Sequence, residues 1–152
     1  MNLLHLLIGT SGRIGRGQFW LSVLILVVAY VVVILVAMLF TSSLDTILYV
    51  GLVAYFLFVL VSIPIALKRL HDRSKPNWWL IVFYGVPLGL QLIVPFLIDS
   101  DADSTPMAVS ILQYAGMAVL LWALVELGFL RGTIGANDYG PDPVAPKLAK
   151  RD

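Results

Sequence analysis

The chain has 152 residues, of which 60% are hydrophobic and 12% are charged, whereas a soluble domain of this size carries about twice that charged fraction. This small polar fraction cannot cover a water-facing surface. The composition therefore argues against a soluble globular enzyme or a disordered tail, and it favours a membrane protein. The net charge of +1 argues against bulk nucleic-acid binding, and the absence of cysteine excludes disulfides, zinc-thiolate sites and thiol catalysis.

Four long apolar runs dominate the chain. They cover residues 19–40, 46–67, 78–98 and 107–130. At about 1.5 Å per residue, each is long enough to cross a hydrocarbon core roughly 30 Å thick. Backbone amides in lipid must be hydrogen-bonded within their own segment, so we expect helices. The first run exceeds the apolar core of a signal peptide and three more follow, so we interpret it as a retained anchor.

These runs predict an all-α, polytopic membrane protein whose four transmembrane helices form a bundle. The transmembrane domain covers residues 19–130, preceded by an interfacial segment, 1–18, and followed by a polar tail, 131–152. The loop 41–45 is too short to let the first two helices separate, so they should form an antiparallel hairpin.

The distribution of basic residues predicts the orientation. All Lys and Arg lie before the first run, between the second and third, or after the fourth. They are Arg13, Arg16, Lys68, Arg69, Arg73, Lys75, Arg131, Lys147, Lys150 and Arg151. The other two loops carry only Asp as charged residues. Both termini and the middle loop are therefore expected in the cytoplasm.

Two glutamines lie inside the apolar runs. Gln91 and Gln113 should lie at nearly equal depth on neighbouring helices, where they can hydrogen-bond to each other. Helix packing explains such residues more simply than substrate binding does.

Glu126 is the one acidic residue inside a run, and an ionisable group there is a functional hypothesis by default. It lies close enough to the cytoplasmic edge to pair with Arg69 or Lys68. Alternatively, it faces inward toward Tyr84 or Ser62. We favour a structural role, and a proton or ion relay remains the alternative.

Three motifs are concentrated on the predicted cytoplasmic face. Residues 12–20 read GRIGRGQFW, residues 68–79 read KRLHDRSKPNWW, and residues 132–143 read GTIGANDYGPDP. In their order and placement they resemble the bacterial family called domain of unknown function 805, over residues 12–143. The middle loop departs from that family's pattern by having Ser-Lys-Pro-Asn before Trp78, where a small residue or glycine is common. The resemblance implies a four-helix protein of the bacterial inner membrane and brings no established activity.

The motif residues form a candidate basic-aromatic face. Arginines can hold phosphate or carboxylate in a bidentate fork, and tryptophans prefer the membrane interface, so the combination suits anionic lipid headgroups or a protein partner. Topology determination alone also accounts for the basic residues. The candidates are Arg13, Arg16, Trp20, Arg69, His71, Asp72, Arg73, Trp78, Trp79, Asn137 and Tyr139.

His71 and Asp72 are adjacent in the middle motif, which raises the question of acid–base or metal chemistry. Adjacent side chains on a helix point apart, however, and the only other histidine is His5. We therefore expect no catalytic residue, no metal site and no cofactor. A network that holds the fold, with Asp72 bonded to Arg13 or Arg16, is the favoured interpretation.

Two further stretches carry weaker signals. The tail lacks the lysine and the preceding strand of a nucleotide loop, and its Gly, Asn and Pro residues predict tight turns that place Tyr139 near the tryptophans. The acidic residues of 99–103 imitate the start of an EF-hand whose later positions are wrong, which leaves a solvated loop or a weak cation patch.

The favoured function is therefore a non-enzymatic membrane protein that organises lipids or docks partners. The expected partners are anionic lipids, with a second copy or another membrane protein as possibilities, and no nucleic acid. The alternative is a small transporter or channel component that uses Glu126 and the two intramembrane glutamines, although these supply few polar groups for a pathway.

Overall fold

The computed structural model describes residues 3–97 and 107–145, and every regular element in these ranges is helical. The first half contains α1 (Leu3–Ile8), α2 (Arg16–Phe40) and α3 (Leu44–Asp72). The second half contains the π-helical η1 (Ile81–Gly85), α4 (Val86–Ile93), the 3-10 turn η2 (Val94–Leu97), α5 (Met107–Leu124) and the π-helical η3 (Val125–Phe129). The acidic loop 99–106, the basic residues 147, 150 and 151, and the side chain of His5 lie outside the described set.

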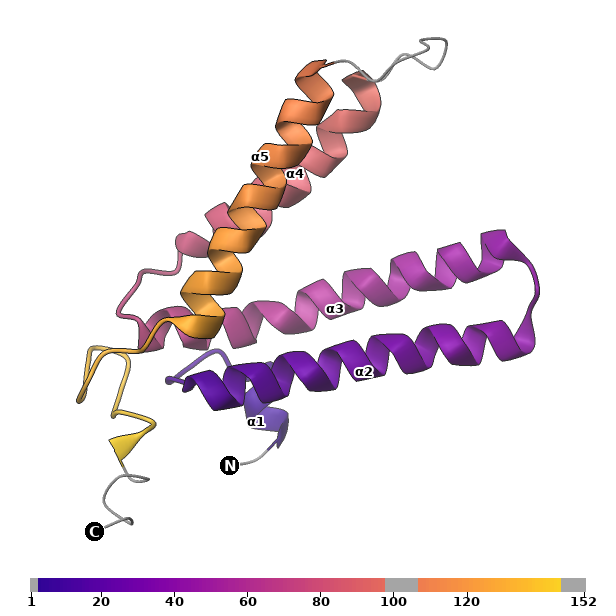
Figure 1. Ribbon diagram of the computed structural model, residues 1–152. Helices are drawn as coiled ribbons and strands as arrows, with labels where there is room; N and C mark the ends of the chain where they lie inside the picture. The colour runs from indigo at the N-terminus through magenta and orange to yellow at the C-terminus, as the bar shows by residue number, and fades with distance from the viewer. Residues whose placement is uncertain (1–2, 98–106, 146–152) are drawn as a thin grey trace.

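The helices form two antiparallel hairpins that meet at one end of the molecule (Figure 1). One hairpin is α2 with α3, and the other is α4 with α5. The two hairpins diverge from the end where α3 and α5 finish (Figure 1), and short α1 packs against α3 at that same end. The chain therefore has a closed end, where all three motifs lie, and an open end.

The described helices confirm the all-α prediction and refine its boundaries. Three helices are long and apolar enough to cross a membrane: Arg16–Phe40, Leu44–Asp72 and Met107–Phe129. The third predicted run is divided into π, α and 3-10 segments, and its longest apolar helix is the shorter stretch Ile81–Ile93. Pro87 lies at this division, where its missing N–H cannot continue a regular ladder of hydrogen bonds.

The end of α3 also differs from the expected loop, because the helix continues to Asp72. It stops where Ser74 adopts a left-handed backbone conformation with φ of 54°, and the Lys75 N–H returns to the Leu70 carbonyl at 2.9 Å. This is the conformation that favours glycine. Ser74 makes the turn here, before Pro76.

The buried core lies at the closed end. It consists of Leu6, Ile14, Phe19, Ile65, Ala66, Leu70, Phe83, Ala123 and Leu127. Toward the open end most apolar side chains are exposed, Val109 being an exception, and Phe40 keeps 86% of its surface accessible. Such exposure is unfavourable in water and costs nothing in hydrocarbon, so the body of the molecule is that of a membrane protein.

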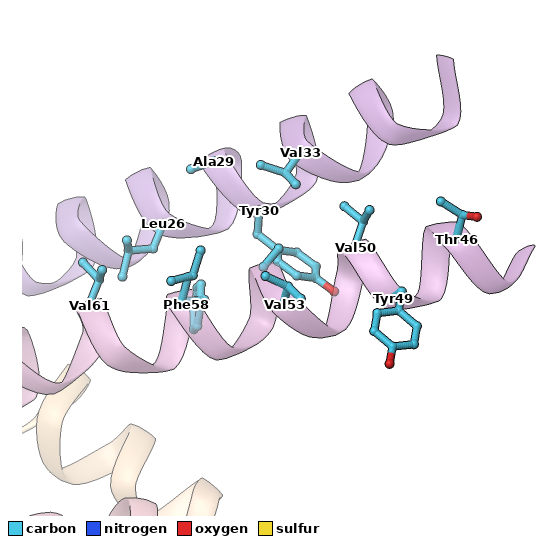
Figure 2. Close-up of a pocket in the computed structure, with 12 residues that line it drawn as sticks. Leu26, Ala29, Tyr30, Val33, Thr46, Tyr49, Val50, Val53, Phe58 and Val61 are labelled. Atoms are coloured by element: carbon cyan, nitrogen blue, oxygen red, sulfur yellow. The ribbon is translucent and has the colours of Figure 1, made fainter. Parts of the chain in front are cut away.

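The outer half of the α2–α3 hairpin packs around small and aromatic residues. Gly51 is buried, and a β-carbon at its position would lie 3.3 Å from Ile34, so glycine lets the helices approach. Figure 2 shows the shallow apolar groove along this hairpin, where Tyr30 points toward α3 and Tyr49 points away from α2. Tyr30 also meets Phe58 edge-on, with ring centroids 6.5 Å apart. The groove therefore exposes apolar side chains to the surroundings.

Candidate functional site

The three sequence motifs converge on Asp72 at the closed end, which we call the junction (residues 9–20, 66–79 and 126–144). The Asp72 side chain is 4% exposed. Its Oδ1 accepts hydrogen bonds from Arg13 Nε at 3.1 Å and Nη2 at 3.0 Å. Its Oδ2 is paired with Arg69 Nη1. We call these three side chains the Asp72 network, in which one carboxylate holds two buried guanidinium groups.

Arg13 extends the Asp72 network into the tail. Its Nη1 donates to the Gly135 carbonyl at 2.7 Å and to the Gly140 carbonyl at 3.2 Å, and its Nη2 donates to the Thr133 carbonyl at 2.7 Å. The side chain is 1% exposed. Since its remaining donors bind Asp72, Arg13 joins the N-terminal segment, the end of α3 and the tail in one contact set.

The last carbonyls of the α5–η3 helix are bonded by side chains from the other hairpin. The pairs are Arg69 with Leu127 (2.6 Å) and with Leu130, Trp20 with Gly128 (3.0 Å), Arg16 with Phe129 (3.1 Å), and Arg73 with Arg131 just beyond the helix (2.6 Å). A helix C-terminus leaves four carbonyls without intrahelical partners and carries partial negative charge. Cationic and N–H donors therefore cap this helix from outside, which binds the two hairpins together.

Two glycines permit this close approach. A β-carbon at Gly132 would lie 1.9 Å from Oδ2 of Asp72, so any larger residue there would force the tail or the carboxylate to move. A β-carbon at Gly128 would lie 2.8 Å from the Trp20 ring. The missing side chains thus make room for the carboxylate and for the indole.

Glu126 forms a second ion cluster beside the Asp72 network. Its side chain is 6% exposed, and Oε1 lies 2.9 Å from Arg73 Nη2 and 3.2 Å from Lys75 Nζ. Lys75 also lies over the Trp79 ring, 4.0 Å from its centroid. We call Glu126, Arg73 and Lys75 the Glu126 cluster. Its two cations belong to the loop that follows α3, and they pair with Glu126 at the end of the α5–η3 helix.

The expected partners of Glu126 are engaged elsewhere. Arg69 belongs to the Asp72 network, and Lys68 donates to the Leu6 carbonyl, which fastens α1 to α3. The Tyr84 hydroxyl donates to the Ser62 carbonyl at 3.4 Å. Sequence reasoning missed Arg73 and Lys75 because their distance along the chain from Glu126 gives no sign of contact.

His71 is buried in contacts that leave its ring no free face. Its Nδ1 lies 3.2 Å from the Gly12 carbonyl, its Nε2 lies 2.9 Å from Asn77 Oδ1, and its ring stacks on Tyr139 with centroids 4.0 Å apart. The Asn137 amide donates to the His71 carbonyl at 2.9 Å. The imidazole therefore packs the tail against the loop, and Tyr139 lies on histidine and not beside the tryptophans.

Asn137 and its neighbours complete the tail's attachment. The Asn137 amide also donates to Ser74 Oγ and Thr133 Oγ1, each at 3.0 Å. The Thr133 N–H and hydroxyl both donate to the Asp72 carbonyl, at 2.8 Å and 3.0 Å. Farther out, hydrogen bonds from the backbone N–H groups of Val144 and Gly135 hold the pKa of Asp142 below its usual range.

The junction's polar side chains are satisfied internally. In the described ranges no buried side-chain nitrogen or oxygen lacks a hydrogen-bond partner. Within the same ranges, no group of three or more His, Asp or Glu residues is placed to hold a metal ion. This arrangement can hold helices together.

Comparison with known proteins agrees with this picture of a membrane body and a motif-bearing junction. The family described as "Protein of unknown function (DUF805)" matches residues 7–141, a range that contains the first two motifs and residues 132–141 of the third. The chain belongs to the DUF805 family. Among its relatives is "Uncharacterized protein YiiR" of Escherichia coli K12, 26% identical over 147 residues, covering 93% of this chain and 90% of YiiR. Another is "Inner membrane protein YhaI" of the same strain, 25% identical over 143 residues, covering 94% of this chain and 92% of YhaI. No solved structure matches the chain.

In this DUF805 protein, the remaining aromatic candidates surround the junction. Trp78 stacks on Trp79 with centroids 4.8 Å apart, and Trp79 meets Trp122 edge-on at 5.2 Å. Trp78 is 53% exposed and Trp20 is 37% exposed. Both indoles are thus available to the membrane interface, whereas Trp79 is half-buried against α5.

The intramembrane glutamines lie apart from the junction of this DUF805 protein. Gln91 and Gln113 both line a cavity of about 750 Å³ between the two hairpins. Both side chains are exposed, and the described residues contain no hydrogen bond between the two. The expected glutamine pair therefore does not form, although both residues lie along one cavity.

Proposed function

We propose that this DUF805 protein is a non-enzymatic, multi-pass protein of a bacterial inner membrane that binds anionic lipids at its junction. The name of its relative YhaI, an inner membrane protein, supports the location. The exposed apolar side chains of the hairpins support insertion in a bilayer. The saturated contacts of His71 and Asp72 argue against acid–base chemistry, because neither group has an open position for a substrate.

The observation that carries this proposal is a division among the arginines. Arg13 and Arg69 are buried and used by Asp72 and the tail, so they hold the fold. Arg16 and Arg131 are exposed, and the described residues contain no carboxylate paired with either. The Arg16 guanidinium donates to the Phe129 carbonyl, and the Phe129 ring meets Trp20, so this exposed cation among aromatic groups suits phosphate at a membrane interface. We therefore assign lipid headgroup binding to Arg16 and Arg131.

The proposal includes four spans with both termini and the middle loop in the cytoplasm. The segments from residue 81 to 97 supply the additional span, because together they extend roughly 25 Å at 1.5 Å per residue, near the thickness of a hydrocarbon core. The placement of Lys and Arg supports the orientation.

Cysteine labelling tests this topology cleanly, because the chain contains no cysteine. Single cysteines at Ser43, Ser74 and Ser104 are exposed in turn to a membrane-impermeant maleimide on intact cells. Positions 43 and 104 should react from outside, and position 74 should react only after the membrane is opened. External labelling at position 74 would overturn the orientation.

The lipid assignment is tested with the full-length protein extracted in a mild detergent. Native mass spectrometry counts the phosphatidylglycerol and phosphatidylethanolamine molecules that remain bound. Wild type should retain phosphatidylglycerol preferentially, and the double variant Arg16→Gln/Arg131→Gln should lose that preference, about tenfold, because it removes two interfacial charges. The matched double variant with Lys at both positions keeps the charge and should retain most binding. Equal retention by the Gln variant and wild type would contradict the assignment.

A further inference from the structure

A cavity lies between the two hairpins, with its inner end at the junction. Its volume is about 750 Å³, and residues of α2, α3, α4 and α5 all contribute to its wall. Leu26 of α2, Leu88 of α4 and Leu120 of α5 are among the lining residues, and the lining is predominantly apolar. Figure 1 shows the hairpins separating on this side, so the cavity lies where hydrocarbon would surround the protein.

Two exposed arginines follow the lining residues at the junction end of this cavity: Arg16 comes three residues before Phe19 and Arg131 comes four residues after Leu127. Arg16 donates to the Phe129 carbonyl, so its guanidinium lies beside the end of the α5–η3 helix, and Arg131 follows two residues later. Trp20 covers the same place, with its ring centroid 5.4 Å from that of Phe129. The basic and aromatic groups thus form an interfacial rim above the apolar walls.

Lining residues of α2 and of α5 lie at similar depths below Arg16 and Arg131. At 1.5 Å per residue, Val23 and Leu26 lie about 10 and 15 Å deeper than Arg16 along α2. By the same measure, Leu124 and Leu120 lie about 10 and 16 Å deeper than Arg131. All four line the cavity. A ligand with an anionic group at the rim would therefore have apolar walls on both sides along the length of its tail.

We propose that an anionic phospholipid of the cytoplasmic leaflet occupies this cavity, with its phosphate between Arg16 and Arg131 and an acyl chain between the hairpins. This deepens the proposed function, on which it rests, by naming the site of the chain as well as that of the headgroup. Charge decides between this occupant and a second copy of the protein. A symmetric second copy would place further arginines against unpaired arginines, whereas a phosphate neutralises them.

The test fills the cavity without touching the rim. Leu88 and Leu120 line it and are 37% and 49% exposed, so a Leu88→Trp/Leu120→Trp variant places two indoles in the space of the acyl chain. Leu92 and Leu121 lie on the same two helices outside the lining and are 71% and 56% exposed, which makes Leu92→Trp/Leu121→Trp the matched control. Helical content by circular dichroism checks that both variants fold.

Purified wild type, the cavity variant and the control are incubated with phosphatidylglycerol that carries a photoreactive group on its acyl chain. Wild type and the control should cross-link at residues of the cavity wall, and the cavity variant should lose about ten-fold in cross-linked product, in proportion to the apolar contact removed. Unchanged cross-linking in the cavity variant overturns the acyl-chain site. If that variant alone is unchanged while Arg16→Gln/Arg131→Gln loses phosphatidylglycerol, the proposed function stands without this site. If neither variant loses lipid, both fail, and a dimer in the native mass spectrum that the cavity variant dissociates would assign the cavity to a second copy.

Discussion

The junction and the outer halves of the hairpins are built on opposite rules. At the junction, buried charges are paired with each other or with backbone carbonyls, and Arg69 and Asp72 are both nearly inaccessible. In the outer halves, apolar side chains such as Leu39 and Phe40 remain more than four-fifths exposed. The difference teaches that polar contacts at one end determine how the helices of this small membrane protein are arranged. The lipid-facing helices need only length and hydrophobicity.

The largest effect is expected from Asp72→Ala. This change leaves the guanidinium groups of Arg13 and Arg69 buried without their anion, and breaking a buried pair in this way costs about 3–5 kcal/mol. Thermal unfolding in detergent, followed by circular dichroism, should show a marked loss of stability or no folded protein. Asp138→Ala removes an exposed carboxylate nearby and should leave the unfolding temperature unchanged. Equal stability of the two variants would show that Asp72 is no different from a surface residue.

Gly132→Ala should have the next largest effect. Its new methyl group would lie 1.9 Å from Asp72 Oδ2, so the tail or the carboxylate must move, at a cost of about 1–3 kcal/mol. Gly17→Ala is the control, because a β-carbon at position 17 meets nothing within 4 Å. The two variants are compared by the same thermal unfolding. A Gly132→Ala protein as stable as the control would mean that the tail does not lie against Asp72.

Glu126→Gln should have a smaller effect. The amide keeps a hydrogen-bond acceptor for Arg73, and the cations of the Glu126 cluster are 22% and 24% exposed, so water can solvate them. We expect a loss of about 1 kcal/mol, comparable to that of a surface ion pair. In proteoliposomes, a pH gradient should drive no flux in either wild type or Glu126→Gln. Flux in wild type that the substitution abolishes would favour the proton relay over a structural role.

The smallest effect concerns pH and the end of the tail. Since two backbone N–H groups stabilise the Asp142 carboxylate, its pKa in the folded protein is lower than the ordinary value of 3.8. The stabilisation is therefore fully present above that value and is lost as pH falls through the folded pKa. The midpoint for Asp142, followed by NMR of its carboxyl carbon, should lie below the ordinary value of 3.8. A midpoint at or above the ordinary value would indicate that the turn at 135–144 is not formed.

The sequence predicted the membrane body better than the junction. Apolar runs report helices directly, because a segment in lipid must satisfy its own backbone, and the limits of α2 and of α5 continued by η3 lie within three residues of those predicted. The prediction that Asp72 bonds Arg13 or Arg16 is confirmed for Arg13. Local pattern was enough there because the candidate anions on this face were few.

Other features of the junction depend on tertiary contact that no local pattern records. Counting basic residues cannot distinguish Arg69, which caps a distant helix, from Arg16, which remains exposed. The stacking of Tyr139 on His71 depends on the tail's turns, which bring together residues that lie far apart in the sequence.

The central claim is that the Asp72 network fixes the two hairpins relative to each other. The chain lacks cysteine, so spin labels can be placed at Leu48→Cys on α3 and Ile111→Cys on α5, both exposed positions in the outer halves that line neither the cavity nor the groove. Double electron–electron resonance in lipid nanodiscs then measures the distance between the hairpins. We predict one narrow distribution in the otherwise wild-type protein and a broad or shifted one with Asp72→Asn, which keeps the shape of the side chain and removes its charge. The same narrow distribution in both proteins would contradict the claim.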